Sequence, residues 1–186
     1  MSVMPFVLVL DRSMPVVPDP IRGPGVMAVH PLGEWRCEHR GRIALALQSA
    51  GSVAALITYS DVARTGLEED SGDPLWDFVY GSNLSHALRL AREACRSSGS
   101  GHVILVTYSL PSAHHDDGGP QFFIPPIPES LDAARREAAT LAEDGLGLDV
   151  FVLTSDDVAE NQALVAFFQA LVEPTQGEVI SVAPAR

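Results

Sequence analysis

Short runs of consecutive apolar residues alternate with stretches of helical periodicity along the chain. The first run, residues 6–10, reads F-V-L-V-L and ends in Asp11 and Ser13. An uninterrupted apolar run of this length is typical of a strand buried on both faces of a parallel sheet. Comparable patterns predict strands over 52–59, 102–107 and 148–153, and shorter strands over 61–67 and 178–182.

Apolar residues recur at helical spacing between these runs. The pattern predicts helices over 39–50, 81–96 and 129–144, and a last helix capped by Ser155 or Asp156. Strands that alternate with amphipathic helices predict an α/β fold, with a doubly wound, mostly parallel sheet flanked by helices in a three-layer sandwich. We find no interdomain linker and expect residues 1–186 to form a single domain.

Two long segments carry too many helix and strand breakers for regular structure. Residues 14–38 contain five prolines and are expected to be irregular. The segment S-A-H-H-D-D-G-G-P at 112–120 reads as a solvated loop. Phe122, Phe123 and Ile124 follow it beside two prolines, and this apolar cluster either packs onto the domain or forms a partner-docking loop.

Composition narrows the classes of partner. The 186 residues include 24 Asp and Glu but only 12 Lys and Arg, which gives a net charge of -12. Nucleic acids and anionic membranes require a basic face, so neither is an expected partner. The first apolar run is too short for a signal peptide or a membrane span, and the two cysteines imply no disulfide framework. We therefore expect a cytoplasmic protein.

Polar residues gather where the predicted strands end or lead into helices. These positions are Asp11 and Ser13, Ser82 and Asn83, and residues 107–109. In α/β folds the carboxyl ends of the strands form the edge at which sites are built. The sequence thus predicts one polar rim made from three loops.

The motifs in these loops resemble the von Willebrand factor A-type (vWA) family. The matching motifs are the apolar strand ending in D-x-S, the helix entry G-S-N-L-S-H-A-L, the strand V-I-L-V-T, and N-Q-A-L followed by G-E-V-I. They occur in the family's order and spacing over nearly the whole chain. The segments W-D-F-V-Y-G-S-N-L, V-T-Y-S-L-P-S-A-H and F-F-I-P-P-I-P-E-S further resemble a bacterial subgroup encoded near AAA+ ATPases of the MoxR or magnesium-chelatase type.

The resemblance implies a metal-ion-dependent adhesion site, usually for magnesium. Its ligands are the aspartate and serines of D-x-S-x-S, a threonine before the second helix and an aspartate after the central strand. Asp11 and Ser13 match, and Ser82 stands where threonine is usual but keeps a hydroxyl. Pro15 occupies the second serine position and Tyr108 the second aspartate position, so neither supplies the usual ligand.

One carboxylate and two hydroxyls predict weak magnesium binding or none, because few carboxylates offset the loss of the cation's water. The alternative is a degenerate rim in which Asp11 hydrogen-bonds to Ser13, Ser82 and backbone amides. Whether Asp61 or Asp116 replaces the missing carboxylate stays open.

The resemblance implies a non-catalytic protein-binding module, an adaptor for a MoxR-type AAA+ ATPase or a companion vWA protein. Two alternatives stay open: a magnesium-dependent vWA domain with a substituted ligand set, and a small hydrolase that uses Asp11. No G-K-[ST] phosphate loop follows any predicted strand, so the chain is not expected to hydrolyse nucleotides itself.

Overall fold

The structure is a computed structural model. It describes residues 4–13, 16–18, 21, 27–29, 32–66, 81–116, 119–122 and 127–184. Within these ranges no helix is both long and apolar enough to cross a membrane.

Six strands form one central sheet in the order β10-β9-β6-β1-β4-β5. All neighbouring pairs are parallel except β4 and β5, which are antiparallel. The strands are β1 (Phe6–Asp11), β4 (Val53–Tyr59), β5 (Ala63–Thr65), β6 (His102–Thr107), β9 (Gly147–Leu153) and β10 (Val179–Val182).

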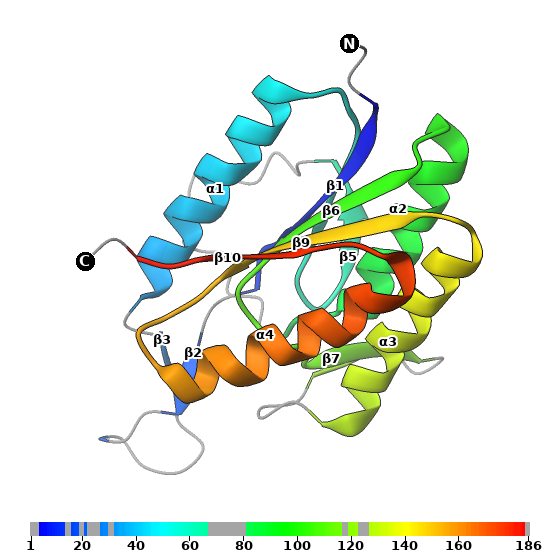
Figure 1. Cartoon of the computed structure of the whole chain (residues 1–186). Coiled ribbons are helices and arrows are strands. Elements are labelled where there is room, and N and C mark those ends of the chain that lie inside the picture. Colours follow the sequence, from blue (N-terminus) through cyan, green and yellow to red (C-terminus); the bar gives the residue numbers. More distant parts are fainter. Residues whose placement is uncertain are drawn as a thin grey trace.

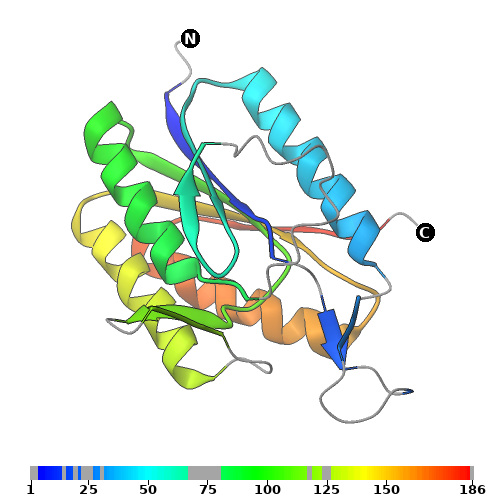
Figure 2. The same ribbon diagram turned by 180° about the vertical axis from the view of Figure 1, so that it is seen from behind.

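Helices cover both faces of the sheet (Figures 1 and 2). Helix α1 packs on one face, against a cluster that includes Leu8, Leu10 and Val106. The other three helices pack together on the opposite face, over Val7, Val9 and Val150. The helices are α1 (Gly33–Ala50), α2 (Leu84–Ser98), α3 (Pro128–Glu143) and α4 (Val158–Val172), which is followed by the short 3-10 helix η1 (Glu173–Thr175). The predicted α/β three-layer fold is confirmed.

Strand β1 lies in the middle of the sheet. Val7, Leu8 and Val9 are fully buried because helices cover both of their faces. This position accounts for the uninterrupted apolar run. It also brings Asp11, the last residue of β1, beside Tyr59 at the end of β4 and close to the end of β6.

The prediction of an irregular segment through residue 38 was wrong at its carboxyl end. Helix α1 begins at Gly33, six residues earlier than expected, and the Arg36 amide donates to the Leu32 carbonyl at 2.9 Å. All the prolines lie before this turn, so none interrupts it. The first turns escaped detection because Arg36, a charged residue, occupies a buried position that an apolar side chain would normally fill.

Two short hairpins lie in the segments predicted as irregular. Strands β2 (Val16–Pro18) and β3 (Met27–Val29) pair antiparallel, as do β7 (Ala113–Asp116) and β8 (Gly119–Phe122). The expected solvated loop at 112–120 is therefore largely a hairpin. Asp116 pairs with Gly119 at the end of this hairpin.

The cap of α4 is one or two residues later than predicted. Asp157, and neither Ser155 nor Asp156, accepts the amides of Ala159 and Glu160, at 2.8 and 3.0 Å. Three polar residues in succession made the sequence ambiguous at this point. Ser155 is instead buried and takes part in a separate cluster described below.

Candidate functional site

Asp11 is the centre of the polar rim, and it is fully buried. Its Oδ1 accepts the Ser13 amide at 2.9 Å and the Ser13 hydroxyl at 2.6 Å. Its Oδ2 accepts the hydroxyls of Thr107 and Ser109, at 2.7 and 2.8 Å. Each carboxylate oxygen thus receives two hydrogen bonds. Both hydroxyl donors on Oδ2 come from the end of β6, which lies directly beside β1.

Tyr108, between these two donors, points to the other face of the sheet and is 1% exposed. Its phenol donates to the Ser13 backbone carbonyl. Arg40 on α1 donates to the Asp11 backbone carbonyl at 2.6 Å and to the Tyr108 oxygen at 3.2 Å. The loop after β1 is therefore held to β6 and α1 through its backbone.

Ser82 lies at the start of the α2 segment but makes no hydrogen bond to Asp11. Its backbone carbonyl accepts the amides of Ser112 and Ala113, and its amide donates to the Ser112 hydroxyl at 3.0 Å. Its side-chain Oγ is buried and has no hydrogen-bond partner among the described residues. Gly81, at φ 114°, makes the turn that leads into this position, and a side chain there would be strained.

Asn83 caps α2. Its Oδ1 accepts the His86 amide at 3.2 Å, and its Nδ2 donates to the Asp61 carbonyl at 2.9 Å. The Asp61 carboxylate accepts the Ser60 hydroxyl at 3.2 Å and makes no hydrogen bond to the Asp11 cluster. Asn83 therefore ties the turn after β4 to α2 and has a structural role in the rim.

The two tyrosines of the rim are kept neutral. Burial, reinforced by the charge of Asp11, raises the pKa of Tyr59 well above its usual value, although the Thr107 and Ser82 hydroxyls lower it. The Tyr59 phenol donates to Thr107 Oγ1 at 3.4 Å. Burial also raises the pKa of Tyr108, against the opposing effect of Arg40.

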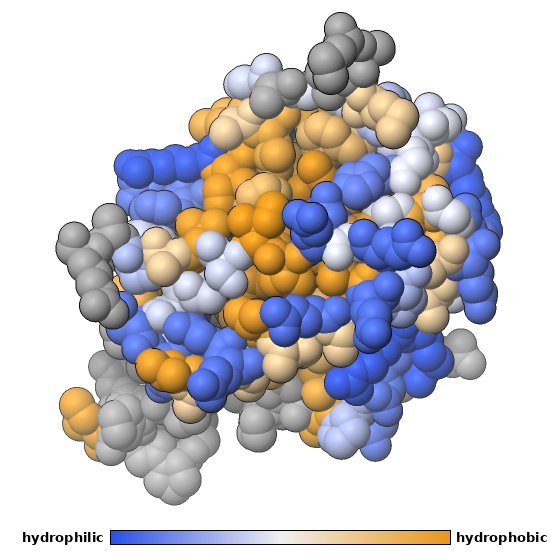
Figure 3. Space-filling model, viewed as in Figure 1, coloured by the Kyte–Doolittle hydropathy of each residue, from blue (hydrophilic) through white to orange (hydrophobic). Residues whose placement is uncertain are grey.

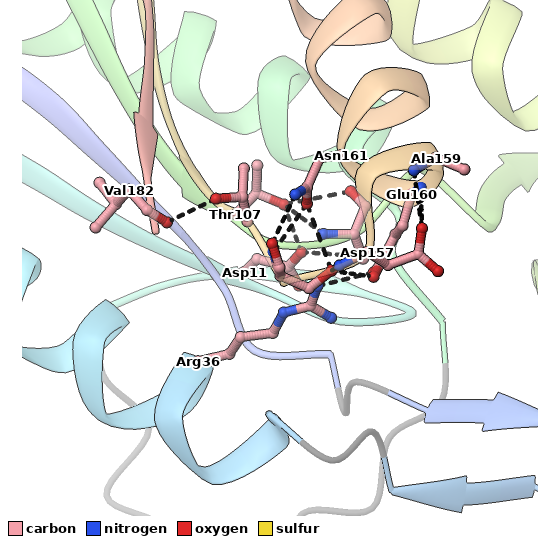
Figure 4. Close-up of polar contacts among 11 residues, drawn as sticks. Asp11, Arg36, Thr107, Asp157, Ala159, Glu160, Asn161 and Val182 are labelled. Carbon is pink, nitrogen blue, oxygen red and sulfur yellow. Dashed lines mark hydrogen bonds and ion pairs between the residues drawn. The ribbon is translucent and has the colours of Figure 1, made fainter. Parts of the chain in front are cut away.

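A second polar cluster joins α1 to the start of α4 (Figure 4). The buried Arg36 donates to Glu160 Oε1 at 2.8 Å, and Ser155 donates to Glu160 Oε2 at 2.6 Å. Asn161 exchanges hydrogen bonds with the Ser155 backbone, at 2.8 and 2.6 Å. This cluster fixes the loop between β9 and α4 at the same end of the sheet as Asp11.

The structure thus brings Asp11, Ser13 and the residues after β6 together, and leaves Ser82 beside Tyr59. The hypothesis that Ser82 hydrogen-bonds to Asp11 was wrong. Sequence reasoning placed Thr107 and Ser109 on the rim but did not identify them as partners of Asp11. It missed Arg40 and Arg36, for which the helical pattern gives no signal.

Several predicted positions lie outside the described residues. They are Pro15, Phe123, Ile124 and the side chains of Asp116 and Phe122. The proposed docking loop at 122–124 therefore stays a prediction, as does replacement of a ligand by Asp116.

The described residues fit a magnesium ion poorly. No group of three or more His, Cys, Asp or Glu side chains that could hold a metal occurs among them. Both oxygens of the Asp11 carboxylate already accept two hydrogen bonds, and Tyr108 stands in place of a second carboxylate. The Arg40 guanidinium also lies 2.6 Å from the Asp11 carbonyl, where its positive charge opposes a cation.

Comparisons with known proteins place the fold. A family model described as "Rv0959-like protein, vWA domain" matches residues 35–186, which excludes β1 but includes Ser82 and the end of β6. No curated protein matches the chain.

Solved structures share the fold at low sequence identity. The D319A mutant of the PilB minor pilin from Streptococcus sanguinis has a TM-score of 0.60 at 11% identity, and covers 100% of this chain and 58% of the pilin. Human COPII-coat protein Sec24c has a TM-score of 0.53 at 16% identity, with 100% of this chain and 30% of Sec24c covered. The chain thus spans little more than half of the one protein and less than a third of the other.

Proposed function

The chain belongs to the vWA domain family of Rv0959-like proteins, and we propose that it is a non-catalytic protein-binding module whose rim works with little or no metal. Its partner would be a MoxR-type AAA+ ATPase or a companion vWA protein. The resemblance of its sequence to the bacterial subgroup supports the choice of these two partners, and the geometry of Asp11 supports metal independence.

The observation that carries this proposal is the saturation of Asp11. Four donors from Ser13, Thr107 and Ser109 surround its carboxylate. Hydrogen bonds to a charged group contribute about 1.5–3 kcal/mol each, so this shell stabilises the buried charge without a cation. A magnesium ion would have to displace or reorient these hydroxyls and then bind to only one carboxylate.

The accessibility of Asp11 also weighs against a hydrolase. A catalytic carboxylate must reach its substrate, directly or through one water molecule. Asp11 is fully buried and Ser13 is 4% exposed. The Ser13 hydroxyl already donates a hydrogen bond to the Asp11 carboxylate. The loop after β9 is an accessible part of the rim, because Asp156 and Asp157 are exposed there. An acidic, exposed loop suits recognition of a basic protein surface.

The metal part of the proposal is tested by thermal unfolding with Mg²⁺ or Mn²⁺ up to millimolar concentration. A ligand that binds only the folded state raises the melting temperature by mass action. We expect no shift beyond that of matched ionic strength, and the same result in Asp11→Ala. A shift that is present in the native chain and absent in Asp11→Ala would instead support the magnesium-dependent alternative.

The partner part is tested by the binding of a purified MoxR-type ATPase or a companion vWA protein, with and without EDTA. Asp156→Arg places a reversed charge on the rim, and Glu143→Arg places the same change on an exposed residue near the end of α3. We expect Asp156→Arg to weaken binding at least tenfold, Glu143→Arg to have little effect, and EDTA to leave binding unchanged. Equal effects of the two variants would contradict binding through the rim.

A further inference from the structure

The face of the sheet that carries α1 is only partly covered near β10. Helix α1 packs on the residues of β1, while Ile104, Phe151 and Val182 are only partly buried. Ile180 on β10 is 39% exposed. In Figure 3 apolar residues gather in the middle of this side, over the sheet between α1 and α4. A contiguous apolar surface of this kind marks an interaction site in a soluble protein.

This apolar surface adjoins the end strand of the sheet. The Val150 amide donates to the Glu178 carbonyl at 2.8 Å, and the Thr154 amide donates to the Val182 carbonyl at 2.9 Å. Alternate residues of a strand point their backbone groups to opposite sides, so those of Val179 and Ser181 point away from β9. β10 has no strand beyond it among the described residues. Two N–H and two C=O groups are thus directed outward.

The two edges of the sheet differ in their protection. At the β5 edge Arg64 is exposed, and the Ala63 amide already donates to His86 Nδ1 at 3.1 Å. The β10 strand reads V-I-S-V and contains no charge, proline or bulge. Natural edge strands that stay unpaired are usually guarded by such features, so β10 resembles a strand that pairs with another chain.

The helix beside β10 is also free of charge on this side. No charged residue occurs between Asn161 and Val172, although the protein has a net charge of -12. The exposed positions of this stretch are all glutamine or alanine: Gln162, Ala163, Ala166, Gln169 and Ala170. Depletion of charge is the compositional mark of an interface core. The exposed face of α4 therefore brings no carboxylate to a contact between two copies of this acidic chain, and the acidic residue next to the strand is Glu178, which is exposed and directly precedes β10.

We propose that a second copy of this chain pairs with β10, so that two antiparallel β10 strands join two six-stranded sheets across a two-fold axis. A two-fold interface needs a surface that complements itself, and outward N–H and C=O groups on an uncharged strand meet that need. Val179 of each copy pairs with Ser181 of the other, which uses every outward group of the strand. The axis passes beside Ile180.

This register makes a specific contact. Ile180 and Ile180 of the second copy form a non-hydrogen-bonded pair, with Cα atoms about 4.5 Å apart. Both side chains lie on the partly covered face, and the two apolar surfaces formed by Phe151, Ile180 and Val182 become one. The dimer interface is therefore separate from the Asp11 rim and leaves the rim free for a partner.

The first test is the mass of the whole chain in solution, measured by sedimentation equilibrium. The native chain is expected to sediment as a dimer at micromolar concentration. Ser181→Pro removes an outward donor without breaking a bond to β9, and Ile180→Asp adds a charge at the axis. Both are expected to weaken dimerisation at least tenfold. Leu45→Asp makes the same change on α1, where Leu45 is 65% exposed, and should leave the dimer intact.

The second test is cross-linking in a Cys37→Ser background, which removes the more accessible native cysteine. Ile180→Cys should form an intermolecular disulfide under mild oxidation, because non-hydrogen-bonded antiparallel pairs bring the two Cβ atoms close enough. Ser181→Cys, whose side chain points to the opposite face, should not. Circular dichroism and thermal unfolding confirm that each variant is folded.

A native chain that stays monomeric at 100-fold higher concentration would overturn the proposal. So would a dimer that survives both Ser181→Pro and Ile180→Asp. If the chain is monomeric and Ile180→Asp weakens the binding of the ATPase or vWA partner, the surface belongs to that partner and self-pairing is wrong.

Discussion

Two carboxylates of the rim, those of Asp11 and Glu160, are stabilised in different ways. Asp11 is fully buried and is held by neutral donors from its own loop and from the end of β6. The Glu160 side chain is 35% exposed and is held by the buried guanidinium of Arg36 and by Ser155. The more deeply buried charge therefore has the neutral partners, and the more exposed one has the ion pair.

This difference shows two ways in which the rim stabilises a carboxylate. Three hydroxyls and one amide distribute the charge of Asp11 over short hydrogen bonds within two adjacent strands. The ion pair of Glu160 has another consequence, because it links α1 to α4 on opposite faces of the sheet. Asp11 thus stabilises the centre of the rim, whereas Glu160 fixes its outer loop.

The largest effect is expected from Asp11→Ala. It leaves the buried hydroxyls of Ser13 and Thr107, and the partly buried hydroxyl of Ser109, without their acceptor. We therefore expect a loss of about 3 kcal/mol in the free energy of unfolding. Urea unfolding at pH 7 measures it, and the slope should stay unchanged if only stability is affected. A loss below about 1 kcal/mol would mean that the hydrogen bonds barely exceed the cost of burying the charge.

The ion pair should contribute less, because Glu160 is partly exposed to water. We expect Arg36→Met to cost about 2 kcal/mol and Glu160→Gln about 1 kcal/mol. A double-mutant cycle isolates their coupling, for which we expect about 1 kcal/mol. A coupling near zero would show that Arg36 acts by packing alone. The carboxylate of Glu160 would then not be stabilised by an ion pair, and the contrast with the neutral donors around Asp11 would be wrong.

The sequence predicts most of this fold because the buried strands are uninterrupted apolar runs. The strand predicted over 102–107 has the bounds of β6. Helix α1 was predicted too short because its first turns bury Arg36, whose partner Glu160 lies 124 residues away. No local pattern contains such a pairing.

The site is partly predictable for the same reason. Asp11 and Ser13 form a local motif, and the end of β6 was placed on the rim. The link from Thr107 and Ser109 to Asp11 depends on β1 and β6 being neighbours in the sheet. Sheet order comes from the packing of the whole chain, so the identity of these donors could not be read from spacing alone.

Alkaline pH should lower the free energy of unfolding through the two tyrosines at the centre of the rim. The pKa values of Tyr59 and Tyr108 are raised above 10.0 in the folded state, mainly by burial. Above about pH 10 the unfolded chain therefore loses phenol protons that the folded chain retains, so stability falls as pH rises. Each tyrosine contributes a slope of about 1.4 kcal/mol per pH unit.

Urea unfolding between pH 8 and 11 measures how steeply the free energy of unfolding falls with pH. Tyr108→Phe should make this slope smaller by the contribution of one tyrosine, about 1.4 kcal/mol per pH unit. The sequence contains no lysine, so no lysine ammonium group titrates in this range. Cys95 adds a slope of the same sign, because burial raises the pKa of its thiol, and it is present in both proteins. An unchanged slope in Tyr108→Phe would indicate that its phenol ionises freely.

The smallest effect is expected at Ser82, and the comparison with Ser13 makes it informative. Ser13→Ala removes a hydroxyl that donates to Asp11 at 2.6 Å and should cost about 1.5 kcal/mol. Ser82→Ala removes a buried hydroxyl that has no partner among the described residues. Relief of its desolvation cost and the loss of its packing oppose each other, so the free energy of unfolding should change by less than about 0.5 kcal/mol in either direction. Repeating both measurements with millimolar Mg²⁺ sharpens the distinction. If hydrogen bonds alone stabilise Asp11, Ser13→Ala should still cost more than Ser82→Ala in the presence of Mg²⁺. If a bound cation uses the Ser82 hydroxyl, both substitutions should lower the free energy of unfolding.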